Sequence, residues 1–367
     1  MTQLKPLFSL LFLLALPYGS AAQEMVWHKI RASQVQGKMA PQTTETFKRL
    51  PGTMQEKVRE PVWELSKNSA GLHIDFETNS PTVEVRYQVA GTLSFPHMPA
   101  TGVSGVDLYL KGKNKEWQWV RGLYKFADTV SYRFQGMAPP KEKTNHHRLY
   151  LPLYNTVLWM EIGIAAGHSL QLVTDRDDRP PLVIYGTSIA QGACASRAGM
   201  GWTNILSRKL DRTVINLGFS GNGRLEPELI EAIAKVPSAA YVLDCMPNFT
   251  SGQGLGPKTA QERLIAAVRQ IRKTRPNTPI IIAEHAGYAD GQAQPGRKQI
   301  YLELNRATQE AIGMLRAEGV PGLYRLSKEE LALDANSFVD GTHPNDHGML
   351  NYAQAYWEKL QTLSFPD

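Results

Sequence analysis

The chain changes its hydrophobic pattern near residue 180. Before that point, short runs alternate apolar and polar residues with a period of two, as in Gly71–Thr78 and Thr82–Val89. Such alternation predicts β-strands with one buried face. Further strand candidates of this kind are Gly105–Lys111, Glu116–Val120, His147–Pro152 and Val157–Gly163. Because no long segment before residue 179 repeats with the period of a helix, we predict an antiparallel β-sandwich domain over residues 23–179.

Beyond residue 179, the apolar runs lose their alternation and are separated by segments with a helical period. The apolar runs are Leu182–Tyr185, Val214–Leu217, Ala240–Leu243, Ile280–Ala283 and Leu323–Leu326. The helix candidates are Gly201–Leu210, Pro227–Lys235, Thr259–Lys273, Lys298–Ala317 and His347–Leu360. Strands that are apolar on both faces and alternate with helices form parallel sheets covered on both sides. We therefore predict a doubly wound α/β domain over residues 180–367, joined to the first domain by the polar linker Val173–Pro181.

The first 22 residues have the pattern of an export signal. A single charge, Lys5, precedes the apolar run Leu7–Leu16, and the small residues Ser20–Ala22 follow. This order is typical of a signal peptide that is cleaved before Gln23. The run is too short to cross a membrane as a helix, so we expect a periplasmic or secreted chain without stable membrane insertion after cleavage. An uncleaved segment would instead act as an N-terminal anchor.

Composition and charge do not point to nucleic acid as a partner. The chain has 42% hydrophobic and 20% charged residues, as ordinary globular proteins do, and a formal net charge of +6. Lys and Arg form no concentrated block, so the charge does not favour nucleic acid as a partner. Two cysteines, Cys194 and Cys245, permit one disulfide in an oxidising compartment. The alternative is two small buried side chains.

Polar blocks follow or overlap the ends of the apolar runs in the second half. They comprise residues 186–188, 216–222, 243–248 and 340–344, the last just before the final helix candidate. The carboxyl ends of parallel strands meet at one edge of the sheet, where such folds carry their function. Taken alone, each block also fits a structural role. A Gly-x-Ser after a strand is more often the capped start of a helix, and Asp-Gly-Thr-His-Pro can be an ordinary loop.

Together, the blocks supply the groups of a serine esterase. Ser188 would be the nucleophile, His343 the general base, and Asp340 the carboxylate that fixes the tautomer of His343. The oxyanion of the tetrahedral intermediate needs hydrogen-bond donors that are in place before the reaction. The backbone amides of Ser188 and Gly221 and the side-chain amide of Asn248 would form this oxyanion hole.

The blocks resemble those of the SGNH (GDSL-like) hydrolases, a superfamily named for its Ser, Gly, Asn and His. The corresponding positions hold Ser188, Gly221, Asn248 and His343, and Asp340 completes the Asp-x-x-His of the last block. Two departures are visible. Thr187 stands where the family more often has Asp, and Asp-Cys-Met-Pro-Asn-Phe replaces the commoner Gly-x-Asn-Asp of the third block.

The resemblance extends to the first domain. Residues 105–109, Gly-Val-Asp-Leu-Tyr, are similar to the Gly-x-Asp-Leu-Tyr signature of a β-sandwich that precedes the catalytic domain in one exported bacterial subfamily. This likeness implies a flavodoxin-like three-layer α/β/α catalytic domain with five parallel strands behind a jelly-roll-like sandwich. It also implies catalysis without a cofactor or a metal. Related enzymes with an attached sandwich are often carbohydrate esterases that remove acetyl groups from plant polysaccharides.

We therefore expect an exported serine esterase whose partner is an acetylated carbohydrate and which forms an acyl-enzyme. A lipase or arylesterase of broad specificity, or an O-acetyltransferase acting on envelope glycans, would use the same residues. A glycan-binding protein with a vestigial catalytic domain is the alternative that is not an enzyme. The sequence leaves open the polysaccharide, the acetylated position, the oligomeric state and the role of the sandwich.

Further histidines near these blocks need separate interpretations. His347 follows His343 by four residues, so the pair could bind a metal ion, but no third ligand is evident. We favour the interpretation that His347 is a residue at the N-terminus of the last helix and not a metal ligand. Glu284 and His285 follow the fourth apolar run and could line a substrate pocket or simply end a strand. They are not included among the catalytic residues.

Overall fold

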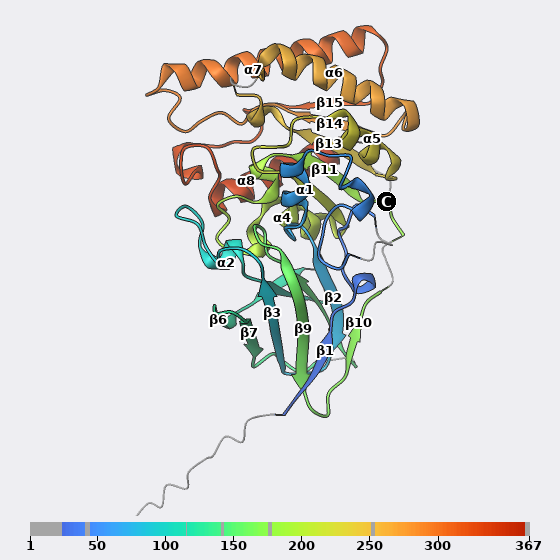
Figure 1. Cartoon of the computed structure of the whole chain (residues 1–367), viewed down its shortest axis with the longest axis vertical. Coiled ribbons are helices and arrows are strands. Elements are labelled where there is room, and N and C mark those ends of the chain that lie inside the picture. Colours follow the sequence, from blue (N-terminus) through green and yellow to red (C-terminus); the bar gives the residue numbers. More distant parts are fainter. Residues whose placement is uncertain are drawn as a thin grey trace, which may run out of the picture.

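The computed structural model describes residues 24–40, 45–114, 116–140, 143–174, 178–250 and 254–363 (Figure 1). The predicted signal peptide, residues 1–22, lies outside the described residues, as do residues 175–177 of the predicted linker. Within the part of the chain that is described, no helix has both the length and the apolar character needed to cross a membrane.

The first part of the chain contains two five-stranded antiparallel sheets, in the orders β1-β9-β3-β7-β6 and β10-β2-β8-β4-β5. Their strands are β1 (Met25–Lys29), β2 (His73–Thr78), β3 (Thr82–Val89), β4 (Asp107–Lys111), β5 (Trp117–Val120), β6 (Gly122–Lys125), β7 (Val130–Gln135), β8 (Asn145–Tyr150), β9 (Val157–Ala165) and β10 (Leu170–Leu172). Phe76 of one sheet and Val85 of the other lie in the same buried cluster. The two sheets therefore pack face to face.

The sequence suggested an all-β first part, but the structure also contains helices there. Two short helices, α1 (Glu60–Ser66) and α2 (Ala100–Val103), and two 3-10 turns, η1 (Ala32–Gln34) and η2 (Gly52–Met54), interrupt it. The helix α1 begins with a proline in its first turn, and its Val62 and Trp63 are buried. Both side chains pack into the core of the α/β part rather than into the sandwich. The all-β description was thus too simple, because Met39, Leu50, Met54, Val62 and Trp63 belong to the core of the α/β part.

The second part is built on a five-stranded parallel sheet in the order β12-β11-β13-β14-β15. The strands are β11 (Leu182–Gly186), β12 (Val214–Gly218), β13 (Ala240–Asp244), β14 (Ile280–Ala283) and β15 (Leu323–Leu326). This confirms the five predicted parallel strands, and the order is that of flavodoxin-like folds. The strand order reverses next to β11, so the carboxyl end of β11 lies where such sheets bind ligands. Ser188 lies two residues beyond the end of that strand.

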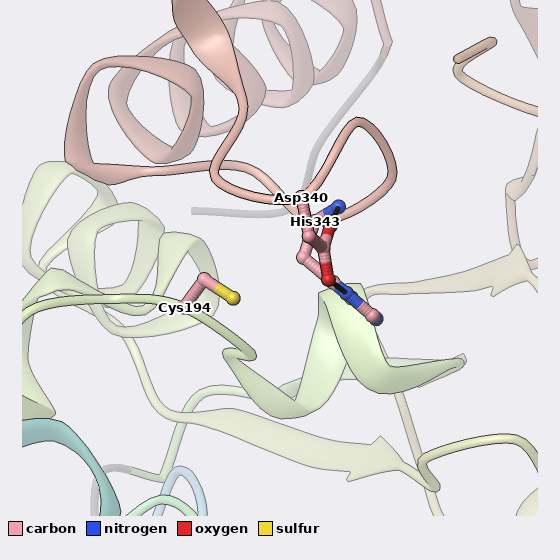
Figure 2. Close-up of side chains that lie close together, drawn as sticks. All are labelled: Cys194, Asp340 and His343. Atoms are coloured by element: carbon pink, nitrogen blue, oxygen red, sulfur yellow. Dashed lines mark hydrogen bonds and ion pairs between the residues drawn. The ribbon is translucent and has the colours of Figure 1, made fainter. Parts of the chain in front are cut away.

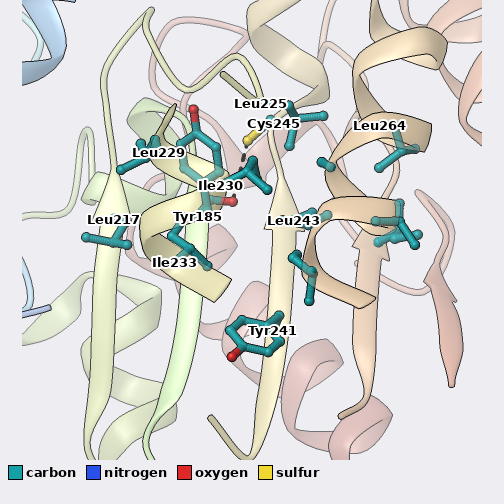
Figure 3. Packing of buried hydrophobic residues seen from close by; sticks show 14 of the residues in the cluster. Tyr185, Leu217, Leu225, Leu229, Ile230, Ile233, Tyr241, Leu243, Cys245 and Leu264 are labelled. Carbon is teal, nitrogen blue, oxygen red and sulfur yellow. Dashed lines mark hydrogen bonds between the residues drawn. The ribbon is translucent and has the colours of Figure 1, made fainter. Parts of the chain in front are cut away.

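Helices cover both faces of this sheet. They are α3 (Ser188–Gln191), α4 (Trp202–Leu210), α5 (Pro227–Lys235), α6 (Pro257–Thr274), α7 (Pro295–Ala317) and α8 (Asp346–Gln361), with 3-10 turns η3 (Ala198–Met200), η4 (Met246–Asn248) and η5 (Ala335–Ser337). Alternate strand residues point to opposite faces. On one face Tyr185 and Leu243 pack against α5, α6 and α7, as Figure 3 shows for α5 and α6. On the other, Ile184 and Val242 pack against α4 and α8.

A buried arginine joins the segment before α1 to the parallel sheet. The Arg49 side chain is fully buried, and its guanidinium donates to the carbonyl oxygens of Gly218 (2.6 Å) and Asn216 (3.2 Å) in β12. It also donates to the carbonyl oxygens of Leu65 (2.6 Å) and Asn68 (2.9 Å). Burial lowers the pKa of this guanidinium. Backbone carbonyl oxygens therefore surround the guanidinium of Arg49. Its hydrogen bonds to Asn216 and Gly218 hold the end of β12, just ahead of Gly221.

The Gly-x-Asp-Leu-Tyr motif forms a second junction between the two parts. The Asp107 carboxylate accepts hydrogen bonds from Arg197 Nη1 (2.7 Å), the Gly199 amide (2.7 Å) and Trp119 Nε1 (3.0 Å). The Tyr109 hydroxyl accepts a second hydrogen bond from Arg197 (2.6 Å). Because Arg197 and Gly199 lie on the loop that follows α3, the motif holds that loop against the sandwich. The guanidinium of Arg197 is thus hydrogen-bonded to Asp107 and Tyr109 of the motif.

A buried carboxyl group lies at the carboxyl end of β13. Asp244 is 1% exposed, and the only hydrogen bond to its side chain within the described residues comes from the Tyr356 hydroxyl at 3.0 Å. Burial raises the pKa of Asp244 to about 7. In the unfolded chain this carboxyl would ionise near its ordinary pKa of about 4. Between these two values the folded state retains a proton that the unfolded state releases, so its contribution to stability falls as the pH rises.

Asp244→Asn is expected to remove this pH dependence. An amide stays neutral and can still accept the hydrogen bond from Tyr356. At pH 4, where the carboxyl is neutral in the folded chain, we expect little difference from the parent. At pH 8 the variant should be more stable by roughly 2–4 kcal/mol. Denaturant unfolding at the two pH values measures this difference, and an equal change at both would contradict a buried carboxyl with a raised pKa.

Candidate active site

The turn after β11 presents Ser188 at the edge of the sheet. Gly186 ends the strand, and a Cβ at this position would lie 2.6 Å from the Ala190 Cβ and 3.0 Å from the Asp244 carbonyl oxygen. Glycine is therefore required by close packing. Thr187 caps the short helix α3 by accepting from the Ile189 amide. The Ser188 side chain consequently lies at the first position of α3, and the residue is 8% exposed.

Ser188, His343 and Asp340 form one chain of hydrogen bonds. The distance between Ser188 Oγ and His343 Nε2 is 2.8 Å, and that between His343 Nδ1 and Asp340 Oδ2 is 2.7 Å. Figure 2 shows Asp340 and His343 on the loop ahead of α8. If His343 carries its proton on Nδ1, it donates to Asp340, and Nε2 is free to accept the proton of the Ser188 hydroxyl. This is the arrangement that activates a serine nucleophile.

The Asp340 carboxylate is held in its ionised form. Its other oxygen, Oδ1, accepts the backbone amides of Thr342 (3.0 Å) and His343 (2.8 Å). Partial burial acts to raise the pKa of Asp340, but the hydrogen bonds from His343 and Thr342 outweigh it, and the pKa lies below its ordinary value. Arg297 of α7 steadies the same loop by donating to Thr342 Oγ1 at 3.0 Å. An ionised carboxylate can stabilise the imidazolium that forms when His343 takes a proton.

Asp340→Asn is expected to lower kcat for ester hydrolysis by about 10³–10⁴-fold. An asparagine amide can present a donor to Nδ1, which favours the tautomer with its proton on Nε2, where it cannot accept from Ser188. Initial rates of p-nitrophenol release from an acetyl ester measure the effect. Asp334→Asn, at an exposed capping residue of the neighbouring turn η5, is the matched control. Equal rates in the two variants would mean that Asp340 does not act on His343.

Gly221 and the Ser188 amide have the form expected of oxyanion donors. Gly221 follows β12 with a φ of +66°, a left-handed conformation that favours glycine, and no atom lies within 4 Å of where a Cβ would stand. Among the described residues, no hydrogen bond engages the amide of either Gly221 or Ser188. Gln191 holds the loop in place by accepting the Ser220 amide at 3.0 Å. Both amides are thus available to a ligand.

Asn248 is brought to the same loop, but its side-chain amide is already engaged. It donates to the carbonyl oxygens of Gly223 at 3.3 Å and Phe219 at 3.4 Å. Both bonds are long for an N–H···O contact. To donate to an oxyanion, Asn248 would have to exchange one of them. Its place in the oxyanion hole therefore stays a prediction.

The two cysteines are unpaired, so the disulfide that the sequence permitted is not formed. Cys245 belongs to the core cluster on the α5 and α6 side of the sheet, and its sulfur lies 3.5 Å from the Tyr185 carbonyl oxygen. Cys194 instead lies beside the loop that carries Asp340 and His343 (Figure 2). The two thiols therefore lie in different surroundings, one in the core and one beside the candidate site. The positions of the two cysteines in the sequence could not reveal this.

Cys194, Asp340 and His343 offer ligand atoms within 4.8 Å of one another, the geometry of a candidate metal site. Their chemistry fits a metal ion poorly. Burial, with a contribution from Asp340, raises the pKa of the Cys194 thiol to about 12, whereas metals bind the thiolate. Both nitrogens of His343 are also engaged, with Ser188 and Asp340.

The remaining sequence candidates lie apart from this chain of hydrogen bonds. His347 is exposed at the second position of α8. Glu284 accepts from Gln309 and Arg325, and His285 is fully buried with a pKa lowered to about 3 by burial and by Arg297. Glu284 and His285 therefore follow β14 as buried polar residues.

Two aromatic residues of the sandwich part reach the active site and were not predicted. The Tyr154 hydroxyl donates to the Ser188 carbonyl oxygen at 3.2 Å. The His97 ring lies beside the His343 ring, with 6.2 Å between centroids and 24° between planes. Both lie in loops outside the predicted strands, where nothing in the sequence marks a residue as facing a distant domain.

Comparisons with known proteins agree with this architecture. A family model described as the GDSL-like lipase/acylhydrolase family matches residues 179–361. A second model, for the Gly-x-Asp-Leu-Tyr N-terminus of SGNH-hydrolase-type esterases, matches residues 25–170. No curated protein matches the chain.

Solved structures of similar fold cover both parts of the chain. A Bacteroides ovatus protein described as a GDSL-like lipase is 30% identical over 94% of this chain and 100% of its own, with a TM-score of 0.84. A salicylyl-acyltransferase from a tetracycline biosynthetic pathway is 20% identical, covering 94% and 98%, with a TM-score of 0.70. An acetyl xylan esterase from the rumen bacterium Butyrivibrio proteoclasticus is 12% identical, covering 80% and 90%, with a TM-score of 0.51.

Proposed function

We propose that this chain, which belongs to the GDSL-like lipase/acylhydrolase family, is an exported serine esterase that removes acetyl groups from a complex carbohydrate. The observation that carries the proposal is the continuous hydrogen-bonded chain from Ser188 through His343 to Asp340. A serine, an imidazole and an ionised carboxylate at these distances provide nucleophile, base and stabilising charge.

The reaction proceeds through an acyl-enzyme. His343 Nε2 takes the hydroxyl proton as Ser188 Oγ bonds to the ester carbonyl carbon, and the carbonyl oxygen becomes an oxyanion beside the amides of Ser188 and Gly221. Collapse breaks the bond to the alcohol oxygen, which leaves with the proton from His343. Water then donates a proton to His343 and attacks the acyl-enzyme, which releases the acid and restores Ser188.

An acetylated carbohydrate fits the surroundings of this site. Gly221 and His97 are exposed, so the edge of the site is open to an extended substrate. One of the similar folds belongs to a protein named as an acetyl xylan esterase. The segment Lys5–Ala22 supports export, where such polymers are found. We expect no cofactor to be required, because the protein groups supply nucleophile, base and oxyanion donors.

The test is acetate release from a panel of acetylated xylan, xyloglucan, pectin and mannan, alongside p-nitrophenyl esters of increasing chain length. Preference for acetyl over longer acyl groups and release from at least one polymer would support the proposal. Rates that rise with acyl length would favour a lipase or general arylesterase instead.

Acyl transfer is the second candidate, because a salicylyl-acyltransferase shares the fold over 94% of this chain. A transferase passes the acyl group from Ser188 to an alcohol in preference to water. Adding a sugar acceptor to the p-nitrophenyl acetate assay distinguishes the two functions. Acetylated sugar as the main product would replace hydrolysis as the proposed activity.

A further inference from the structure

The sandwich part places a second imidazole next to the candidate catalytic histidine. His97 is exposed, and its ring lies nearly parallel to that of His343, with 6.2 Å between centroids. No hydrogen bond links the two imidazoles, because the His343 nitrogens are already bonded to Ser188 and Asp340. Among the described residues no hydrogen bond engages the His97 ring, so this imidazole lies beside the candidate site with its nitrogens available to a ligand.

A rigid turn fixes the position of His97. Phe95 and Met98 bracket it with two reciprocal backbone hydrogen bonds of 3.0 Å. Met98 is 2% exposed and packs in the same cluster as Ile189 of α3. The Phe95 ring stacks on His97 and meets the Tyr154 ring edge-on, with 6.0 Å between centroids in each case. Packing on both sides thus holds the imidazole where it stands.

The chemistry of the acyl transfer places the alcohol of the ester beside the His343 ring. His343 Nε2 must give its proton to the leaving oxygen, so that oxygen lies next to the His343 ring when the ester bond breaks. Because the His97 ring lies beside the same His343 ring, we infer that the alcohol portion of the ester comes within reach of His97. A neutral imidazole offers one donor and one acceptor, which suits a hydroxylated alcohol such as a sugar.

We propose that His97 is a specificity-determining residue that binds hydroxyl groups of the leaving alcohol, so that the sandwich forms part of the substrate site. This inference rests on the proposed esterase function and assigns its substrate class on the alcohol side. A binding residue of this kind raises kcat/KM for substrates that carry the matching polar group and hardly changes it for substrates that lack the group.

Replacing His97 by Phe tests the proposal, since Phe retains an aromatic ring and loses both hydrogen-bonding atoms. We expect kcat/KM for an acetylated xylose or xylo-oligosaccharide to fall by about 10–100-fold, as when a polar group of the site loses its partner. The fall for p-nitrophenyl acetate, whose leaving group carries no hydroxyl besides the leaving oxygen, should be under about 3-fold. His97→Gln, which retains a donor and an acceptor, should restore part of the sugar-ester activity.

His347→Phe, at an exposed histidine on α8, is the matched control and should not change the ratio of the two kcat/KM values. Equal losses on both substrates in His97→Phe would show that His97 only positions His343 or the fold, and would overturn the proposal. No loss on either would overturn it as well. A parent enzyme that hydrolyses neither substrate would instead refute the esterase function on which the proposal rests, and the proposal with it.

Discussion

Ser188→Ala is expected to lower kcat for acetyl-ester hydrolysis by about 10⁴–10⁶-fold while leaving the fold intact. Without Oγ no acyl-enzyme can form, and the oxyanion donors alone give only a small residual acceleration. The only hydrogen bond of the Ser188 hydroxyl within the described chain is the one to His343 Nε2, and because the His343 side chain is partly exposed, water can replace the lost partner. We expect the melting temperature to change little.

Rates of p-nitrophenol and acetate release, together with thermal melting, measure this prediction. Ser169→Ala is the matched control, because this serine lies in the sandwich part, where its hydroxyl hydrogen-bonds, among the described residues, only to Asn79. The control should retain the activity of the parent. Undiminished hydrolysis by Ser188→Ala would eliminate the serine mechanism, whereas unfolding of the variant would point to a structural role.

Arg49→Met is expected to cause the largest loss of stability among the substitutions considered, about 3–5 kcal/mol in the free energy of unfolding. Methionine fills much of the volume but donates no hydrogen bond. The carbonyl oxygens of Gly218, Leu65 and Asn68 would lose their charged donor inside the protein. Hydrogen bonds from a charged donor contribute about 1.5–3 kcal/mol each, and the desolvation of Arg49 offsets part of their sum.

Denaturant unfolding of the full chain measures the effect, with Arg269→Met as control. Arg269 is an exposed arginine of α6 paired with Glu318, and its loss should change stability by less than about 1 kcal/mol. Similar small changes in the two variants would contradict the view that Arg49 ties the first part of the chain to the parallel sheet. Because Arg49 reaches β12, the variant should also lose activity at temperatures below its melting point.

The parallel sheet was predictable because its strands are buried on both faces. Ile280–Ala283 and Leu323–Leu326 were predicted with the bounds that the structure shows, and the other three strands each extend one residue further. In the sandwich, β7 (Val130–Gln135) was missed although its residues alternate, which is the signal that would have found it. The edge strands β1 and β10 are short and half-buried, so their patterns are weak.

The residues of the site divide in the same way. Ser188, Asp340 and His343 could be singled out because each stands in a short motif at the end of a strand or ahead of a helix, and the structure brings them together, while their catalytic roles stay predictions. The contribution of His97 and Tyr154 could not, since it depends on how the sandwich docks on the α/β part. The contacts of Arg49 with Gly218 and of Asp107 with Arg197 are among those that hold the two parts together, and each joins residues that are distant in sequence.

Covalent labelling with a fluorophosphonate tests the central claim most directly. An activated serine attacks phosphorus and displaces fluoride, which leaves a stable phosphonyl ester that peptide mass spectrometry can locate. The geometry predicts one adduct on the peptide that contains Ser188, formed in step with the loss of esterase activity and absent from His343→Ala. An enzyme that hydrolyses acetyl esters yet carries no adduct at Ser188 after complete inhibition would contradict the account.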